Sequence, residues 1–237
     1  MLIVKNYTIY SEKKSILKDL EYTFLPGKTY AIMGPNGSGK STFALSLSGS
    51  KNFTLDPTSQ VFLGTEELTN IESHKRAQKG LFVSFQSPPD LSGITVFSML
   101  RIALHGKISA LELKQSIESY AQRLHIPKEL LSRSLNDGFS GGERKKMELL
   151  QMAILNPFCS ILDEIDTGVD IDALKVMSTF LLEQKSPEKT FIIITHRPSF
   201  ARNLQADTVL ILKKGVFVAE GDLRLLETIE KEGYENI

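Results

Sequence analysis

Short apolar runs separated by polar turns fill the first third of the chain and predict strands. Leu, Ile, Val, Tyr and Phe dominate these runs, as is typical of strands, and Pro26 and Gly27 predict a turn before the third run. The runs cover residues 2–10, 22–25 and 29–33. Residues 51–70 are polar and turn-rich around a short apolar group, and they predict a peripheral hairpin.

Later apolar runs predict the rest of the sheet structure. The expected strands are residues 81–85, 158–164 and 190–195, followed by a closing hairpin of residues 207–212 and 216–219. Residues 222–232 then have the pattern of an amphipathic terminal helix, and Gly233 is expected to end it.

Between about residues 92 and 135 the pattern becomes helical. Ser109 and Glu112 fit a capping box, in which each side chain accepts a hydrogen bond from the backbone N–H group of the other residue. Apolar residues then recur on one helical face at Leu113, Ile117, Tyr120, Ala121 and Leu124. We therefore expect a helical subdomain, at about residues 87–138, inserted into a single domain of residues 1–237.

A phosphate-binding pattern, G-x-x-x-x-G-K-[ST], lies between a predicted strand and a predicted helix. It consists of Gly34, Pro35, Asn36, Gly37, Ser38, Gly39, Lys40 and Ser41, and Thr42 continues into the helix. A glycine-rich turn that binds nothing is the alternative, but the strand–loop–helix order is the context that the motif requires. Backbone N–H groups and the helix dipole would surround phosphate oxygens, Lys40 would reach the outer phosphates, and the Ser41 hydroxyl would ligate Mg²⁺.

Polar residues follow the predicted strands at the positions where open parallel sheets bind ligands. Asp163, after the run at 158, can hold Mg²⁺ directly or through water, and Glu164 beside it can polarise an attacking water. His196 could donate a hydrogen bond to a terminal phosphate. Gln86 follows another predicted strand, and the nearby motifs favour a functional role over a plain polar strand end. A solvated acidic turn and a structural histidine are the alternatives.

Ser140, Gly141, Gly142 and Glu143 open a second predicted helix. Ser140 and Glu143 fit a capping box, and the two glycines also expose N–H groups at a helix N-terminus, where anions bind. Both interpretations can hold together. A second phosphate-binding element outside the first loop predicts a nucleotide that is held from two sides.

The overall composition excludes several classes of protein. The chain has 237 residues with 28 basic and 28 acidic side chains, so its charge predicts no nucleic-acid binding. No apolar run approaches the roughly 18 residues of a membrane span, so we expect no direct membrane insertion. The lone Cys159 excludes an intramolecular disulfide, suits the cytoplasm and is expected to be buried. Tyr7 or Tyr10 either stacks on an adenine base or packs in a strand, and the sequence leaves this open.

The order of these motifs resembles that of the ATP-binding cassette (ABC) ATPases along essentially the whole chain. The resemblance implies an α/β fold, with a P-loop NTPase core, an N-terminal antiparallel β subdomain and an inserted helical subdomain. It also implies that the signature segment, residues 140–143, closes over ATP bound by another copy in a homodimer. Asp170 would lie in a loop between the two sites, and Glu143 stands where transporters usually carry Gln.

Within that superfamily the chain is most similar to the SufC family, the ATPases of SUF iron–sulfur cluster assembly. The similarity lies in residues 85–88, 138–146, 162–175 and 226–234, with departures at Val169, after His196 and between 95 and 130. It implies SufB- and SufD-like scaffold partners. The ATP-binding subunit of an ABC membrane transporter is the alternative, and a non-hydrolysing paralogue or a DNA-linked ATPase is a weaker one.

The mechanism that follows is Mg²⁺-dependent ATP hydrolysis. Lys40 and the loop amides would stabilise phosphate charge, and Glu164 would handle the water. The resemblance adds that Gln86 senses metal and water and that His196 holds the terminal phosphate. We further expect that Lys145 could pair with Glu164 at rest and silence it.

Overall fold

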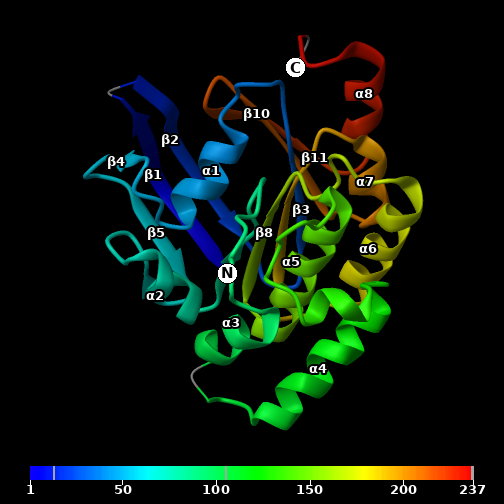
Figure 1. Ribbon diagram of the computed structural model, residues 1–237. Helices are drawn as coiled ribbons and strands as arrows, with labels where there is room; N and C mark the ends of the chain where they lie inside the picture. The colour runs from blue at the N-terminus through cyan, green and yellow to red at the C-terminus, as the bar shows by residue number, and fades with distance from the viewer. Residues whose placement is uncertain (13, 105, 236–237) are drawn as a thin grey trace. The chain divides into compact units, whose positions relative to one another are not determined.

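The computed structural model describes residues 1–12, 14–104 and 106–235, which form two compact units. The first unit comprises residues 1–86, 157–164 and 185–237, and the second comprises residues 87–156 and 165–184. The expected fold is confirmed: a P-loop NTPase core is accompanied by an antiparallel β part and by helical segments (Figure 1).

A mainly parallel sheet forms the centre of the first unit. Its strands, in spatial order, are β11 (Val216–Gly221), β10 (Thr208–Lys213), β3 (Thr29–Met33), β9 (Thr190–Ile194), β8 (Cys159–Asp163) and β7 (Leu81–Val83). All neighbouring strands are parallel except β10 and β11, which form the predicted closing hairpin. Because the strands are parallel, the carboxyl ends of β3, β7, β8 and β9 share one edge.

A second, antiparallel sheet contains the N-terminal strands. Strand β1 (Leu2–Ser11) pairs with β2 (Lys14–Phe24), β4 (Thr54–Leu55) and β5 (Gln60–Leu63), and β5 continues into β6 (Glu66–Glu67). The predicted peripheral hairpin is therefore β5–β6. The run at residues 22–25 belongs to a strand that begins much earlier, at Lys14.

Short helices complete the first unit. They are α1 (Lys40–Leu47), α2 (Ser73–Gln78), α7 (Pro198–Asn203) and α8 (Leu225–Glu232). Helix α8 begins three residues later than expected and ends at Gly233, as predicted. Helices α2 and α7 were not predicted, because six residues are too short to show a helical period.

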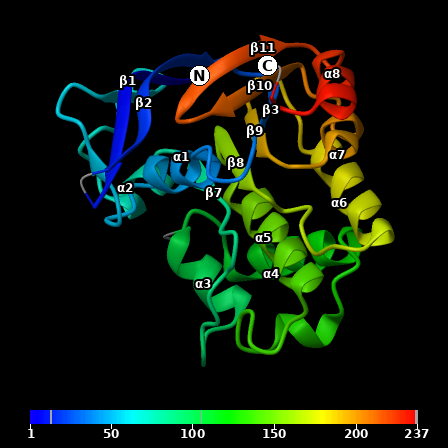
Figure 2. The ribbon, with the colours of Figure 1, turned by 90° about the horizontal axis from the view of Figure 1, so that it is seen from above.

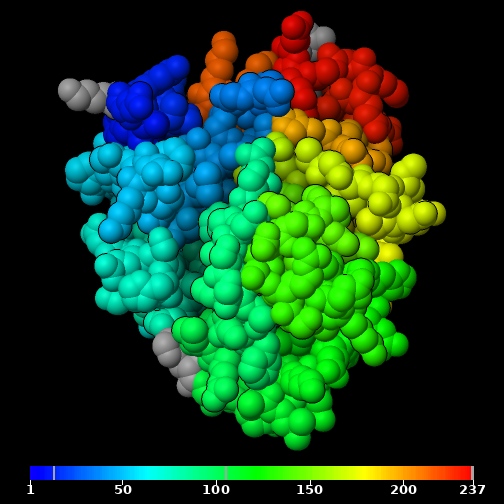
Figure 3. Space-filling model, in the orientation of Figure 1, coloured from blue at the N-terminus to red at the C-terminus, as the bar shows by residue number. Residues whose placement is uncertain are grey.

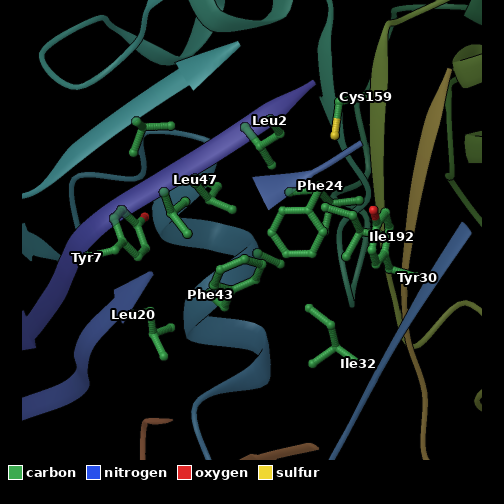
Figure 4. Close-up of a cluster of buried hydrophobic side chains, with 14 of the residues drawn as sticks. Leu2, Tyr7, Leu20, Phe24, Tyr30, Ile32, Phe43, Leu47, Cys159 and Ile192 are labelled. Carbon is green, nitrogen blue, oxygen red and sulfur yellow. The ribbon is translucent and has the colours of Figure 1, made fainter. Parts of the chain in front are cut away.

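Helix α1 lies between the two sheets of the first unit (Figure 2), and its apolar face joins them into one core. Phe43 and Leu47 contribute from α1, Phe24 from the antiparallel sheet, and Ile32 and Ile192 from the parallel sheet (Figure 4). All of these side chains are buried. Burial of the Phe43 and Leu47 side chains, at roughly 1.5–3 kcal/mol each, anchors α1 against both sheets. The loop before α1 therefore has a rigid support.

The second unit is helical. It contains α3 (Val96–Ala103), α4 (Ala110–Arg123), a 3₁₀ turn η1 (Lys128–Leu131), α5 (Gly141–Leu155) and α6 (Ile171–Glu183). Both predicted capping boxes are present, Ser109 with Glu112 at α4 and Ser140 with Glu143 at α5. The apolar face of α4 is confirmed by buried Leu113, Ile117 and Ala121.

Candidate nucleotide-binding site

The phosphate loop, residues 34–41, connects β3 to α1 and uses backbone conformations that favour glycine. Gly34 has φ 151°, and a Cβ atom placed there would lie 2.0 Å from the carbonyl oxygen of Leu212. Gly39, the residue before α1, has φ 109°. The first turn of α1 carries no acidic residue, so its positive dipole end is left for an external anion.

Lys40 folds its side chain back over the loop. Its Nζ donates to the carbonyl oxygens of Gly34 and Pro35, each at 2.9 Å, and its side chain is largely buried. Burial lowers the pKa of Lys40, while the negative charges of Glu164 and Asp163 oppose that shift. A phosphate would bring negative charge to this ammonium group and favour its charged form.

Asp163 ends β8 and is buried at the shared strand edge. Its backbone N–H donates to the Ser84 hydroxyl at 2.8 Å, and the Ser84 N–H donates to Ile161 at 2.9 Å. Ser84 therefore joins the end of β7 to the end of β8 beside the carboxylate. Serine after a short strand carries no recognisable sequence signal, so Ser84 could not be identified before the structure.

Glu164 is the centre of a hydrogen-bonded group. Its Oε2 accepts from Gln86 Nε2 at 3.0 Å, and its Oε1 lies 2.9 Å from His196 Nε2. The backbone of Glu164 has φ 50°, which is uncommon for a residue other than glycine, and its N–H donates to Ile194 at 2.9 Å. Both carboxylate oxygens are thereby oriented, so three residues predicted to be catalytic lie together.

This geometry is suited to one side of a hydrolytic site. The Glu164 side chain is 13% exposed and that of His196 is 34% exposed. Water can therefore reach the carboxylate, while most of its surface is screened. With Nε2 protonated, His196 donates to Glu164 and holds it. A carboxylate fixed in this way can accept a proton from a nearby water.

Oxygen donors suited to Mg²⁺ are available in the same unit. Ser41 offers a hydroxyl, Asp163 a carboxylate and Gln86 an amide oxygen, and Mg²⁺ commonly takes one or two such protein ligands together with phosphates and water. The donor set therefore fits the predicted metal. Across residues 1–12, 14–104 and 106–235, no group of three or more His, Cys, Asp and Glu side chains could hold a metal alone.

The signature segment begins α5 in the second unit. Ser140 Oγ accepts from the Glu143 N–H at 3.3 Å, and Glu143 Oε2 accepts from the Ser140 N–H at 2.7 Å. The bond from the Ser140 N–H lowers the pKa of Glu143. Asp170 similarly begins α6 by accepting from Ala173 at 2.7 Å.

The glycines of this segment are not required by their surroundings. A Cβ at Gly142 would meet no atom of the described residues within 4 Å, and at Gly141 it would meet the Gly168 oxygen at 3.9 Å. Both have ordinary helical backbones, where glycine costs roughly 1 kcal/mol relative to alanine. The absence of side chains at Gly141 and Gly142 lets a group from outside the chain approach the backbone closely, which is a physical reason for glycine at these positions.

The open question about the tyrosines is resolved against Tyr7. Its ring is buried edge-on against Phe43, and its hydroxyl donates to Ser46 Oγ at 2.8 Å, so it packs in the core. Tyr10 is partly buried and donates to Asp56 at 3.3 Å.

The proposed pairing of Lys145 with Glu164 stays a prediction.

The strand order, the phosphate loop and the group around Glu164 define a nucleotide-binding cassette of the P-loop class. Residues 17–167 match the ABC transporter family, and the chain belongs to that family. Among the described residues, no helix is both long enough and apolar enough to span a membrane.

Individual proteins support the assignment. "Probable ATP-dependent transporter SufC" of Escherichia coli K12 is 36% identical over 99% of this chain and 97% of its own length. A nucleotide-free ATP-binding cassette from an ABC transporter superposes with a TM-score of 0.79 at 25% identity, covering 99% of this chain and 98% of that chain. A dimeric cassette bound to ADP and Pi has a TM-score of 0.80 at 20% identity, covering 94% and 99% respectively.

Proposed function

We propose that this protein is a Mg²⁺-dependent ATPase and that both units belong to one ATP-binding domain. The observation that carries the proposal is the placement of Glu164, whose two oxygens are held by Gln86 and His196. The phosphate loop lies at the same carboxyl edge of the parallel sheet as Glu164. An oriented carboxylate at this edge is suited to positioning a water for attack on a terminal phosphate.

Each predicted residue has a role in this proposal. Residues 34–42 cradle the phosphates, and Lys40 exchanges a loop carbonyl for a phosphate oxygen. Bound Mg²⁺, held by Ser41, Asp163 and Gln86, would neutralise phosphate charge. His196 holds both Glu164 and the terminal phosphate.

A second copy of the chain completes the site in this proposal. Ser140, Gly141 and Gly142 of that copy would present the N-terminus of α5 to the phosphates. The support is that Gly142 is open on the surface of its own chain. ATP would then draw two copies together, and hydrolysis would release them.

The biological setting we propose is iron–sulfur cluster assembly in the cytoplasm. The support is the similarity to the relative named SufC across nearly the whole chain. Closing and opening of the dimer would remodel a SufB/SufD-like scaffold. Burial raises the pKa of the Cys159 thiol to about 12, which suits a chain that supplies work rather than cluster ligands. Relatives are also named as transporters, so an ATP-binding subunit of a membrane transporter is the second candidate.

Hydrolysis is tested by phosphate release from ATP with the purified chain. We expect release in the presence of Mg²⁺ and a fall to the protein-free background when EDTA removes it, because triphosphate charge is then uncompensated. Restoring excess Mg²⁺ should recover the rate. Equal release with and without the metal would contradict the proposed chemistry.

The partner assignment is tested by purifying a tagged chain from its own cells under mild conditions. We expect soluble SufB- and SufD-like proteins to copurify. A detergent-solubilised membrane fraction from the same cells serves as the comparison. Recovery of a permease in that fraction, without the soluble scaffold, would replace the assembly role by the transporter role.

A further inference from the structure

The hairpin of β10 and β11 ends in a two-residue turn, Lys214 and Gly215, which lies beside the phosphate loop. Lys213 pairs with Val216 across this turn. Both turn residues have positive φ, 52° at Lys214 and 86° at Gly215, as in a type I′ turn. Figure 3 shows the turn (orange) at the surface, between the N-terminal strands (dark blue) and the segment of the phosphate loop (lighter blue). Lys214 is exposed, whereas Gly215 is buried, so the turn is packed through its second residue.

Both backbone polar groups of Gly215 bond to neighbouring segments. Its N–H group donates to the carbonyl oxygen of Ser38 in the phosphate loop at 3.0 Å, and its carbonyl oxygen accepts from the Lys18 N–H group of β2 at 2.9 Å. The hydrogen bond of a β-turn joins its first and fourth residues, so the groups of Gly215 are available to other segments. Gly215 thereby connects the phosphate loop to the antiparallel sheet.

Only glycine fits at residue 215. A Cβ atom there would lie 2.2 Å from the carbonyl oxygen of Ile16, which is a backbone atom, and 3.2 Å from the α-carbon of Leu17. The same stretch of β2 also packs against the loop, because a Cβ atom at Gly39 would lie 2.7 Å from Leu17 Cδ2. The turn, β2 and the phosphate loop therefore meet at Gly215 with no space for a side chain.

The bond from Gly215 fixes the orientation of one peptide group of the loop. The peptide group between Ser38 and Gly39 is planar and trans, so its N–H group points opposite to its carbonyl group. Because this carbonyl is directed at Gly215, the Gly39 N–H group is directed away from the turn. Gly39 is the residue before α1, where backbone N–H groups bind phosphate oxygens in the proposed function.

We propose that Gly215 is a positioning residue for the phosphate loop. The turn holds the peptide group between Ser38 and Gly39 so that its N–H group faces the bound phosphates. This inference rests on the proposed ATPase function. The group around Glu164 is held by separate hydrogen bonds, so Gly215 acts on nucleotide binding and not on the attacking water.

The test compares Gly215→Ala with Gly64→Ala. Gly64 also lies in a two-residue hairpin turn of the first unit, between the paired residues Leu63 and Glu66, and has φ 64°. A Cβ atom there would meet no atom of the described residues within 4 Å, so this control introduces the strain of a positive φ without a clash. Both substitutions should lower the melting temperature, and the control reports how far such strain alone affects ATP.

Only Gly215→Ala is expected to weaken nucleotide binding. The clash with Ile16 displaces the turn, and the Gly39 N–H group loses its fixed direction. We expect the ATP KM, and the Kd measured by calorimetry with Mg²⁺ and ATP, to rise about tenfold, as for loss of one hydrogen bond to a charged group. The kcat should stay within about threefold of wild type, because the phosphates are charged both before and during the reaction. Gly64→Ala should change neither constant.

A measurement on the unsubstituted chain is independent of how the variants fold. NMR should detect a scalar coupling across the hydrogen bond between the Gly215 nitrogen and the Ser38 carbonyl carbon, with and without nucleotide. On addition of Mg²⁺ and a non-hydrolysable ATP analogue, the Gly39 amide proton should move downfield, since a hydrogen bond to a charged phosphate is short and strong. Absence of the coupling, or an unchanged Gly39 resonance in the nucleotide-bound chain, would overturn the positioning role.

The outcomes separate this inference from the function on which it rests. If the wild-type chain binds no ATP, the proposed function is wrong. If the wild type binds ATP and folded Gly215→Ala binds it equally well, the positioning role is overturned. Equal rises in KM for Gly215→Ala and Gly64→Ala would also overturn it, because general destabilisation would then be the cause. If Gly215→Ala does not fold, the two NMR results decide.

Discussion

Replacing Glu164 by Gln is expected to lower ATP turnover at least about 100-fold while ATP still binds. The amide has nearly the same shape but cannot accept a proton from water. Gln86 and His196 both direct N–H groups at the carboxylate, so the substitution also mismatches one of these bonds. Phosphate release measures turnover, and calorimetry with Mg²⁺ and ATP measures binding. Because closure precedes hydrolysis in the proposed cycle, the variant should accumulate as an ATP-bound dimer, seen by size-exclusion chromatography.

Glu188→Gln is the control for this experiment. Glu188 is exposed and lies in the turn before β9, so the same loss of charge there should leave turnover unchanged. Turnover of Glu164→Gln within about threefold of wild type would remove Glu164 from its proposed role as the group that handles water.

Replacing Gly142 by Asp is expected to stabilise the free chain and yet abolish ATP-driven dimerisation. An acidic residue in the first helical turn interacts favourably with the dipole, by about 0.3–1 kcal/mol, and the described surroundings of Gly142 leave space for the side chain. In the proposed dimer the same carboxylate would face phosphate oxygens and repel them. We expect the melting temperature to hold or rise while turnover falls at least about 100-fold, since electrostatic stabilisation of phosphate is lost.

Leu111→Asp is a closely matched control. Leu111 occupies the second position of α4, after the Ser109 capping box, just as Gly142 follows Ser140 in α5. Its side chain is 66% exposed. This variant should show the gain in melting temperature without the loss of turnover. Normal turnover and dimerisation of Gly142→Asp would mean that α5 does not approach a nucleotide.

The central part of the site could be predicted from the sequence because its signals are local. The phosphate loop is one uninterrupted motif, and Asp163 and Glu164 directly follow an apolar run. The contact of Glu164 with Gln86 and His196 could not be derived in this way, because these residues lie 78 and 32 positions from it. Their meeting depends on β8 lying between β7 and β9, and spatial strand order leaves no trace in a hydrophobic pattern.

Strand β2 shows why part of the fold was missed. Its buried residues Leu17 and Leu20 are three positions apart, an odd spacing that breaks the alternation expected of a half-buried strand. The pairs Tyr7–Leu20 and Ile9–Leu17 show that β2 contains one extra residue there, and Asp19 has φ 47°. Because of this bulge, the side chains of Leu17 and Leu20 both face the core, although the alternation of buried and exposed residues along the sequence is interrupted.

Ser84 was missed for a different reason. It acts through a backbone group of a distant residue, Asp163. Backbone donors are present at every residue, so their partners produce no pattern of matched side chains. Such supporting residues become visible only when the chain is folded.

The position of Cys159 has a practical consequence. Its thiol is buried at the first residue of β8, between β7 and β9, and remains protonated at neutral pH. Its side chain is packed in the apolar core of the first unit, so an alkylating reagent can reach it only when that core opens, and the reagent then reacts with the thiolate. The rate of its modification therefore reports opening of this core, with no probe engineered into the protein.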